Sequence, residues 1–200
     1  ARRQGLAAAL MGAAEALAPT APILMALGAG FINDVRALTR PGALAAAAAT
    51  GLPVCLMHMQ GEPGTMQQRP HYDDIFAELD AFFDERMAAC KMAGIDGSRL
   101  VIDPGFGFGK SLAHNVALLD RLAHFRRYGP LLVGMSRKSM LGALLGGAPV
   151  DQRLHAGVAA AVISVMNGAS IVRVHDVKAT ADALVVATAV LQRRSQEVQA

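Results

Sequence analysis

The sequence predicts an α/β fold built around a parallel sheet, and three observations lead to this prediction. The chain has 200 residues, of which 53% are hydrophobic and 18% charged, so it holds enough apolar material for the core of one domain. Short apolar runs alternate with longer segments of helical character along most of the chain. Polar side chains gather where the apolar runs end, which is typical of the carboxyl edge of a parallel sheet.

The apolar runs have the length and composition of buried strands. They are Phe31–Val35, Pro53–Met59, Leu100–Asp103, Leu131–Met135 and Ile171–Val174. The segments between and after them have the composition of helices: Pro41–Ala49, Asp73–Met92, Ala113–Phe125, Asp151–Met166 and Lys178–Gln192. Two earlier segments, Gly5–Leu17 and Ile23–Leu27, also favour helix. This alternation predicts βαβ units, which place the strands parallel to one another.

Charge and cysteine usage exclude several classes of protein. The net charge is +3 and aromatic residues are only 4%, with the basic residues scattered, so we expect no nucleic-acid partner. No uninterrupted apolar run reaches the length of a membrane span, so we expect no membrane insertion. Cys55 lies in an apolar run and Cys90 in a helical pattern, which indicates reduced core thiols and a cytoplasmic location.

Polar or reactive side chains stand at or just after the end of each predicted strand. They are Asn33 and Asp34, then His58 and Gln60, then Asp103 and Lys110, then Ser136–Ser139, and finally Arg173, His175 and Asp176. Helix capping accounts for Asp34, Ser139 and Asp176. It does not account for Lys138, Arg173 and His175 together. Since parallel strands end at one edge of their sheet, we expect a shared binding site there.

A glycine run follows the third strand but matches no standard phosphate motif. Its members are Gly105, Gly107 and Gly109. A Walker A loop requires glycine where Pro104 stands, and a dinucleotide fingerprint requires it where Lys110 stands. Lys110 is therefore only a weak phosphate signal. We interpret the run as a flexible loop that lets a ligand approach Phe106 or Phe108 closely.

The histidines show no spacing typical of metal ligands. Met57 and Met59 flank His58, a combination that soft metals bind, but on a strand these residues more readily line a pocket. We therefore assign no metal ligands. Three histidines in helical stretches are expected to be solvated or packed: His114, His124 and His155.

Five ordered motifs resemble one known family. They are Phe31–Val35 (FINDV), Val54–Gly61 (VCLMHMQG), Ile102–Lys110 (IDPGFGFGK), Val133–Ser139 (VGMSRKS) and Ile171–Asp176 (IVRVHD). In this order they resemble the dihydropteroate synthases, from about Gly28 to about Leu191. The resemblance implies a TIM-type (β/α)₈ barrel. It also implies a folate-biosynthesis transferase, a sulfonamide target, that joins 6-hydroxymethyl-7,8-dihydropterin diphosphate to 4-aminobenzoate and releases diphosphate.

The likeness is incomplete at the start of the chain. The family has three further βα units before Phe31, with the metal-binding residue for Mg²⁺ and a pterin-facing carboxylate among them, and none is found in residues 1–27. We therefore expect a helical leader at 1–27 and a partial pterin-binding barrel at 28–200. An open sheet leaves an unpaired edge at Phe31–Val35. The absence of the three units implies little or no synthase activity for this chain alone. The unpaired edge implies self-association, and we expect a homodimer.

The resemblance also assigns roles to residues of this chain. It implies that pterin is bound by Asn33, Met57, Asp103, Gly107 and Lys138. It implies that diphosphate is bound by Arg173 and His175, and that aminobenzoate is bound by Phe108 and Ser136. Lys138, Arg173 and His175 are the expected catalytic residues. Chemically, a carboxylate such as Asp103 accepts two adjacent N–H groups of a pterin edge, and Asn33 reads a mixed edge.

Two alternatives remain open for this sequence. One is a methyltetrahydrofolate-type methyltransferase with the same pterin-binding residues, and the other is a non-catalytic remnant. The pairing of Ser136–Ser139 with Arg173 and His175 favours the synthase, because a methyltransferase has no diphosphate to bind.

Overall fold

The structure is a computed structural model that describes residues 30–62 and 64–199. The strands are β1 (Ile32–Asp34), β2 (Val54–Met57), β3 (Leu100–Asp103), β4 (Leu132–Val133) and β5 (Ile171–Val172). The helices are α2 (Ala43–Thr50), α3 (Ile75–Met92), α4 (Leu112–Asp120), α5 (Ser139–Leu144), α6 (Leu154–Met166) and α7 (Val177–Gln199). Short 3₁₀ helices cover Gly97–Arg99, Leu122–Tyr128 and Val150–Gln152.

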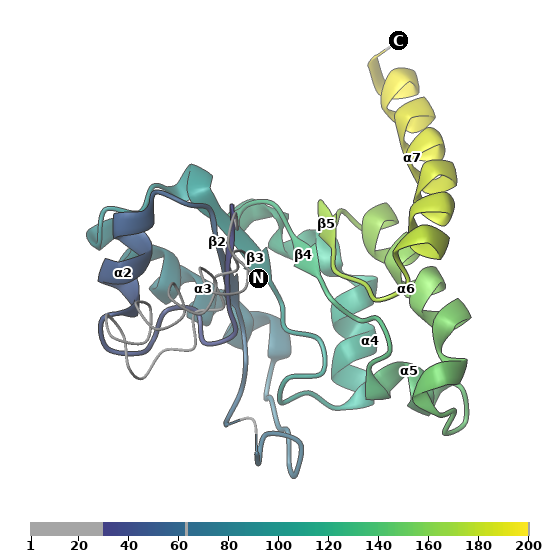
Figure 1. Cartoon of the computed structure of the whole chain (residues 1–200), viewed down its shortest axis with the longest axis horizontal. Coiled ribbons are helices and arrows are strands. Elements are labelled where there is room, and N and C mark those ends of the chain that lie inside the picture. Colours follow the sequence, from purple (N-terminus) through teal and green to yellow (C-terminus); the bar gives the residue numbers. More distant parts are fainter. Residues whose placement is uncertain (1–29, 63, 200) are drawn as a thin grey trace, which may run out of the picture.

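All strands run parallel and follow one another in chain order. β1, β2 and β3 form one ladder, and β4 and β5 form a second. A parallel bridge between Ile102 and Leu131 joins the two ladders into one curved arrangement, with helices outside it (Figure 1). Among the described residues β1 pairs only with β2 and β5 only with β4, so this sheet is open at both edges. None of the helices in the described part is long and apolar enough to span a membrane.

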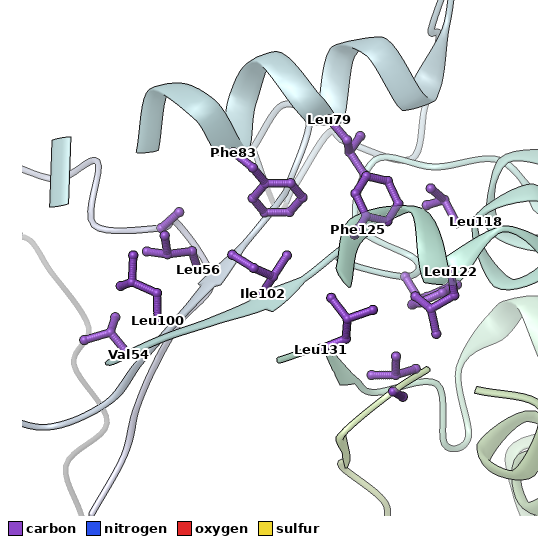
Figure 2. Close-up of a cluster of buried hydrophobic side chains, with 14 of the residues drawn as sticks. Val54, Leu56, Leu79, Phe83, Leu100, Ile102, Leu118, Leu122, Phe125 and Leu131 are labelled. Carbon is purple, nitrogen blue, oxygen red and sulfur yellow. The ribbon is translucent and has the colours of Figure 1, made fainter. Parts of the chain in front are cut away.

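The main core lies between the strands and the helices. Alternate strand residues, among them Leu56 and Ile102, are fully buried on this face. Figure 2 shows Leu79 and Phe83 pointing from α3 toward them, with Phe125 alongside. A small second cluster, Cys55, Val101 and Leu132, occupies the opposite face. Both cysteines are buried free thiols, as expected.

Local signals explain where the helices begin. The Asp74 side chain accepts hydrogen bonds from the backbone N–H of Phe76 (2.9 Å) and Ala77 (3.2 Å), which starts α3. Ser111 and His114 form a reciprocal capping box at the start of α4. This contact gives His114 the structural role that its helical context indicated.

The predicted strands and most helices are found, with two differences. The expected helix Ala113–Phe125 ends at Asp120, and a 3₁₀ helix continues the chain. The six-residue helix α5 was not predicted, because it is short and begins without a side-chain cap. The helices expected at Gly5–Leu17 and Ile23–Leu27 lie outside the described residues.

Candidate functional site

The strand ends bring one set of polar side chains together on the face away from α3. Ile32, Leu56 and Ile102 belong to the helix-covered core. By alternation, the next residues along these strands, Asn33, Met57 and Asp103, belong to the opposite face. Met57 is paired in register with Asp103, so the two side chains are neighbours across the ladder.

The same alternation places the last strands' residues on this face. Val133 is paired with Val172, and both contact the main core. Gly134 and Arg173 follow them on the opposite face. A Cβ atom added to Gly134 would lie 2.9 Å from the Nη2 atom of Arg173, so the glycine leaves the space that the guanidinium occupies.

A buried carboxylate lies at the centre of this face. Asp103 is 3% exposed, and its Oδ1 atom accepts a hydrogen bond of 2.8 Å from the Gly105 N–H. Burial raises the pKa of this carboxyl, while that hydrogen bond and the positive charges of Lys138, Arg173 and Lys110 oppose the rise. The arrangement favours a ligand that offers hydrogen-bond donors to a carboxylate shielded from water.

Lys138 and Phe108 form a second part of the site. The Lys138 ammonium lies 4.5 Å from the centroid of the Phe108 ring and donates to the backbone carbonyl of Phe106. Burial lowers the pKa of Lys138 to about 8, with Asp103 acting in the opposite direction. The ammonium is thus fixed beside both the carboxylate and an aromatic ring.

Ser136 and His175 form the more open part of the site. The backbone N–H of His175 donates to Ser136 Oγ at 3.2 Å, and the imidazole Nδ1 lies 3.1 Å from the same oxygen. A cavity of about 390 Å³ opens here. Its lining residues are Gly134, Ser136, Arg137, Lys138, Val150, Arg173 and His175. Their charge is strongly positive, which suits an anionic ligand.

Two of the three glycines in the run after β3 pack closely against the loop after β2. Phe106 is fully buried, which leaves Phe108 as the residue of the expected pair that a ligand could approach. Gly105 has φ +71°, and a Cβ there would lie 1.8 Å from the His58 carbonyl oxygen. Gly109 (φ +64°) would similarly bring a Cβ to 2.3 Å from the carbonyl oxygen of Gln60. These glycines are needed for packing against the loop after β2.

Gly107 lies at the site itself. Its φ is +77°, and a Cβ would lie 3.3 Å from Lys138 Cδ. Its N–H donates to the Asn115 side chain at 2.7 Å. The sequence analysis did not identify Asn115, which is 2% exposed. A buried amide in the first turns of a helix cannot be recognised from the sequence alone, because its role depends on a hydrogen-bond partner in another segment.

Of the three residues to which helix capping was applied, one makes a local capping contact, and it caps a turn at residues 35–38 instead of a helix. The Asp34 carboxylate accepts from the backbone N–H of Arg36 (3.1 Å) and Leu38 (2.7 Å), which confirms a local role. The Asp176 carboxylate instead accepts two hydrogen bonds from Arg137, at 2.7 and 3.2 Å. Ser139 is the first residue of α5, which has no side-chain cap.

The comparisons with known proteins agree with this geometry. Residues 18–175 match the family model described as pterin binding enzyme, and the chain belongs to this family. The match includes residues 18–27, which our sequence analysis placed in the leader. The partial barrel is therefore part of a pterin-binding fold.

Dihydropteroate synthases are among the relatives that the chain matches. The chain is 57% identical over 172 residues to the one from Escherichia coli K12, a match that covers 86% of this chain and 61% of that protein. Over 159 residues it is 51% identical to the one from Haemophilus influenzae, covering 79% and 58%. The chain thus spans about three fifths of the length of these relatives.

Solved dihydropteroate synthases superpose well on this structure. A Yersinia pestis enzyme in a sulfonamide drug complex gives a TM-score of 0.80 at 54% identity, covering 82% of this chain and 60% of that one. A Xanthomonas albilineans enzyme in complex with 7,8-dihydropteroate gives 0.76 at 52% identity, covering 82% and 62%. The fold class expected from the sequence is confirmed.

Proposed function

We propose that this chain supplies the last five βα units of a dihydropteroate synthase, the folate-biosynthesis transferase that condenses 6-hydroxymethyl-7,8-dihydropterin diphosphate with 4-aminobenzoate. One observation carries the proposal. The carboxylate of Asp103, buried at the carboxyl edge of the strands, is flanked by the cations of Lys138 and Arg173. That pattern suits a ligand with a donor-rich ring and an anionic tail.

The pterin ring occupies the β1–β3 part of this face. Asp103 accepts adjacent N–H groups, Lys138 lies toward the ring carbonyl and N5, and Met57 gives a polarisable surface. Gly107 leaves room for Lys138. Asn33 supports this placement, because its buried Oδ1 atom has no hydrogen-bond partner among the described residues. A buried acceptor of this kind calls for a donor from a ligand.

The diphosphate occupies the open cavity, where Arg173 and His175 donate to its oxygens. The C–O bond breaks, and its electron pair leaves with the diphosphate, so a resonance-stabilised pterin cation remains. The nitrogen of 4-aminobenzoate, held near Phe108 and Ser136, then forms the C–N bond and loses a proton to solvent. Arg173, His175 and Lys138 are catalytic because they stabilise the departing charge.

Three further parts of the proposal concern the surroundings of the site. Mg²⁺ would neutralise part of the diphosphate charge, but no group of three or more His, Cys, Asp or Glu in the described residues could hold a metal ion. We also propose a homodimer and a cytoplasmic location. A structure of a relative with 4-aminobenzoic acid supports the assignment of 4-aminobenzoate as a substrate. A structure of another relative with a sulfonamide drug supports sulfonamide binding.

Calorimetric titration of the chain with 6-hydroxymethylpterin tests the proposal. Asp103→Asn should weaken binding by about 2–4 kcal/mol, because an amide cannot accept two donors side by side as a carboxylate does. The exposed Asp84 on α3 supplies the matched control, and Asp84→Asn should leave affinity unchanged. Equal affinity for the wild-type chain and the Asp103 variant would remove Asp103 from the site and contradict the proposal.

A further inference from the structure

Lys110 is a buried cation to which the proposed chemistry gives no role. Its side chain is 3% exposed, so it is not available to a diphosphate in the open cavity. The ammonium lies 2.9 Å from His58 Nδ1 and donates to the carbonyl oxygens of Gly105 and Phe108, both at 3.1 Å. One side chain thus connects the loop after β2 with the loop after β3.

The residues that Lys110 contacts in turn contact residues of the site directly. The N–H of Gly105 donates to the Asp103 carboxylate at 2.8 Å, and the N–H of His58 donates to the Asp103 backbone carbonyl at 3.0 Å. The Phe108 ring lies under the Lys138 ammonium. The carbonyl of Gly105 also accepts from the N–H of Phe108 at 3.0 Å, which closes a tight turn around the Lys110 ammonium.

Burying an ammonium here is unfavourable for folding. Desolvation lowers the pKa of Lys110 to about 7, with Asp103 raising it and Lys138 lowering it further. Apolar side chains of similar volume usually stabilise such positions as well or better. What an apolar side chain lacks is a set of donors that fixes the directions of several carbonyl groups at once.

We propose that Lys110 is a positioning residue that holds the Gly105–Phe108 turn, and so orients the Asp103 carboxylate and the Phe108 ring toward the ligands. The identity of those ligands rests on the proposed function. The positioning itself does not, because it concerns the backbone of this chain.

Hydrogen exchange of the intact 200-residue chain is the first test, with Lys110→Met as the variant. The amides of Gly105 and Phe108 should exchange at least about tenfold faster, because their turn loses its central donor. Amides in the middle of α3 should change less than about twofold. The exposed Lys91 gives the matched control, and Lys91→Met should change neither group. Unchanged exchange at Gly105 and Phe108 would overturn the proposal.

Ligand binding separates positioning from a general loss of structure. Lys110→Met should lower affinity for 6-hydroxymethylpterin at least about tenfold but change affinity for inorganic diphosphate less than about twofold. Arg173 and His175 lie after β5, where their backbone N–H groups donate to the Val133 carbonyl and to Ser136 Oγ. Equal losses for both ligands would mean a merely structural lysine. If the wild-type chain binds no pterin, the proposed function fails, and the exchange result still decides the positioning.

A variant that retains part of the donor set guards against misfolding. If Lys110→Met shows no cooperative unfolding transition, Lys110→Gln is measured in its place, because its amide keeps two N–H donors in the same pocket. Faster exchange confined to the Gly105–Phe108 turn supports the proposal, and unchanged exchange overturns it.

Discussion

The β1–β3 half and the β4–β5 half of the sheet meet at one bridge, yet they hold their functional groups in different ways. In the first half, Met57 and Asp103 are 2% and 3% exposed and are fixed by backbone hydrogen bonds and close glycine contacts. In the second half the strands have two residues each, Ile171 is 39% exposed, and His175 lies at the surface.

The difference corresponds to the two parts of the proposed substrate. A flat heterocycle is recognised by a few directed hydrogen bonds, which are strong only where water is excluded. A diphosphate carries its charge over many oxygens and must also leave, so an open cavity lined by cations suits it. We therefore propose that the first half recognises the heterocycle and that the second half releases the diphosphate.

Substituting Gly105 should cause the largest loss of unfolding free energy in the first half. Gly105→Ala forces a left-handed backbone and an overlap with the His58 carbonyl, and should cost about 3–5 kcal/mol of unfolding free energy. Gly51 has a similar φ of +67° with nothing within 4 Å of an added Cβ. Gly51→Ala should therefore cost only about 1–2 kcal/mol. Urea denaturation measures both, and equal costs would show that the His58 contact does not constrain the loop.

Removing a cation should affect only the second half. Arg173→Ala should reduce affinity for inorganic diphosphate about ten- to a hundredfold, because charge-assisted hydrogen bonds are lost. Affinity for 6-hydroxymethylpterin should fall less than about threefold. The exposed Arg194 on α7 provides the control substitution to alanine. Parallel losses for both ligands would assign Arg173 to support of the pocket.

Lower pH should reduce the unfolding free energy, because His58 is buried in the first half of the sheet. Burial and the nearby Lys110 charge lower the pKa of His58 to about 2, from an ordinary value of 6.5. Between these values the unfolded chain binds the proton and the folded chain does not. The unfolding free energy should therefore fall as pH decreases below about 6.5, by up to about 1.4 kcal/mol per pH unit.

Variants identify the source of this acid dependence. The pKa of Lys110 is about 7 in the folded chain, so this lysine is protonated in both states at most of these pH values. His58→Gln should flatten the slope below pH 6.5, as followed by urea denaturation at each pH. His71 is exposed, and His71→Gln should leave the slope unchanged. A slope that persists in the His58 variant would assign the effect to other groups.

The smallest effect is expected at the ion pair between Arg137 and Asp176. Asp176→Ala should change Tm by no more than about 2 °C, because solvent screens a partly exposed pair. Affinity for diphosphate should still fall about threefold, since the pair joins the loops that carry Ser136 and His175. Differential scanning calorimetry and diphosphate titration measure the two quantities. A large Tm change with unchanged affinity would make the pair structural only.

Local patterns predicted the strands and the residues at their ends, because burial and alternation are properties of short segments. Asn33, Asp103 and Arg173 could be placed at one edge from the strand order alone. The packing of Gly105 could not, because it depends on the carbonyl of His58, far away in the sequence. The sequence indicates Lys110 only as a weak phosphate ligand for the same reason: its hydrogen-bond acceptors lie on two loops that are distant in sequence.

In the proposed pterin site, the amide oxygen of Asn33 would restrict which analogues can occupy this face. A ring tautomer that presents an N–H there satisfies the buried acceptor, which has no other partner in the described part of the chain. A tautomer that presents a lone pair at that point brings two acceptors together. Sites built to bond a donor reject analogues that lack it by about 10⁴–10⁵, far more than apolar pockets discriminate by size. Inhibitor scaffolds N-methylated at this position would lose the donor and collide with the amide as well.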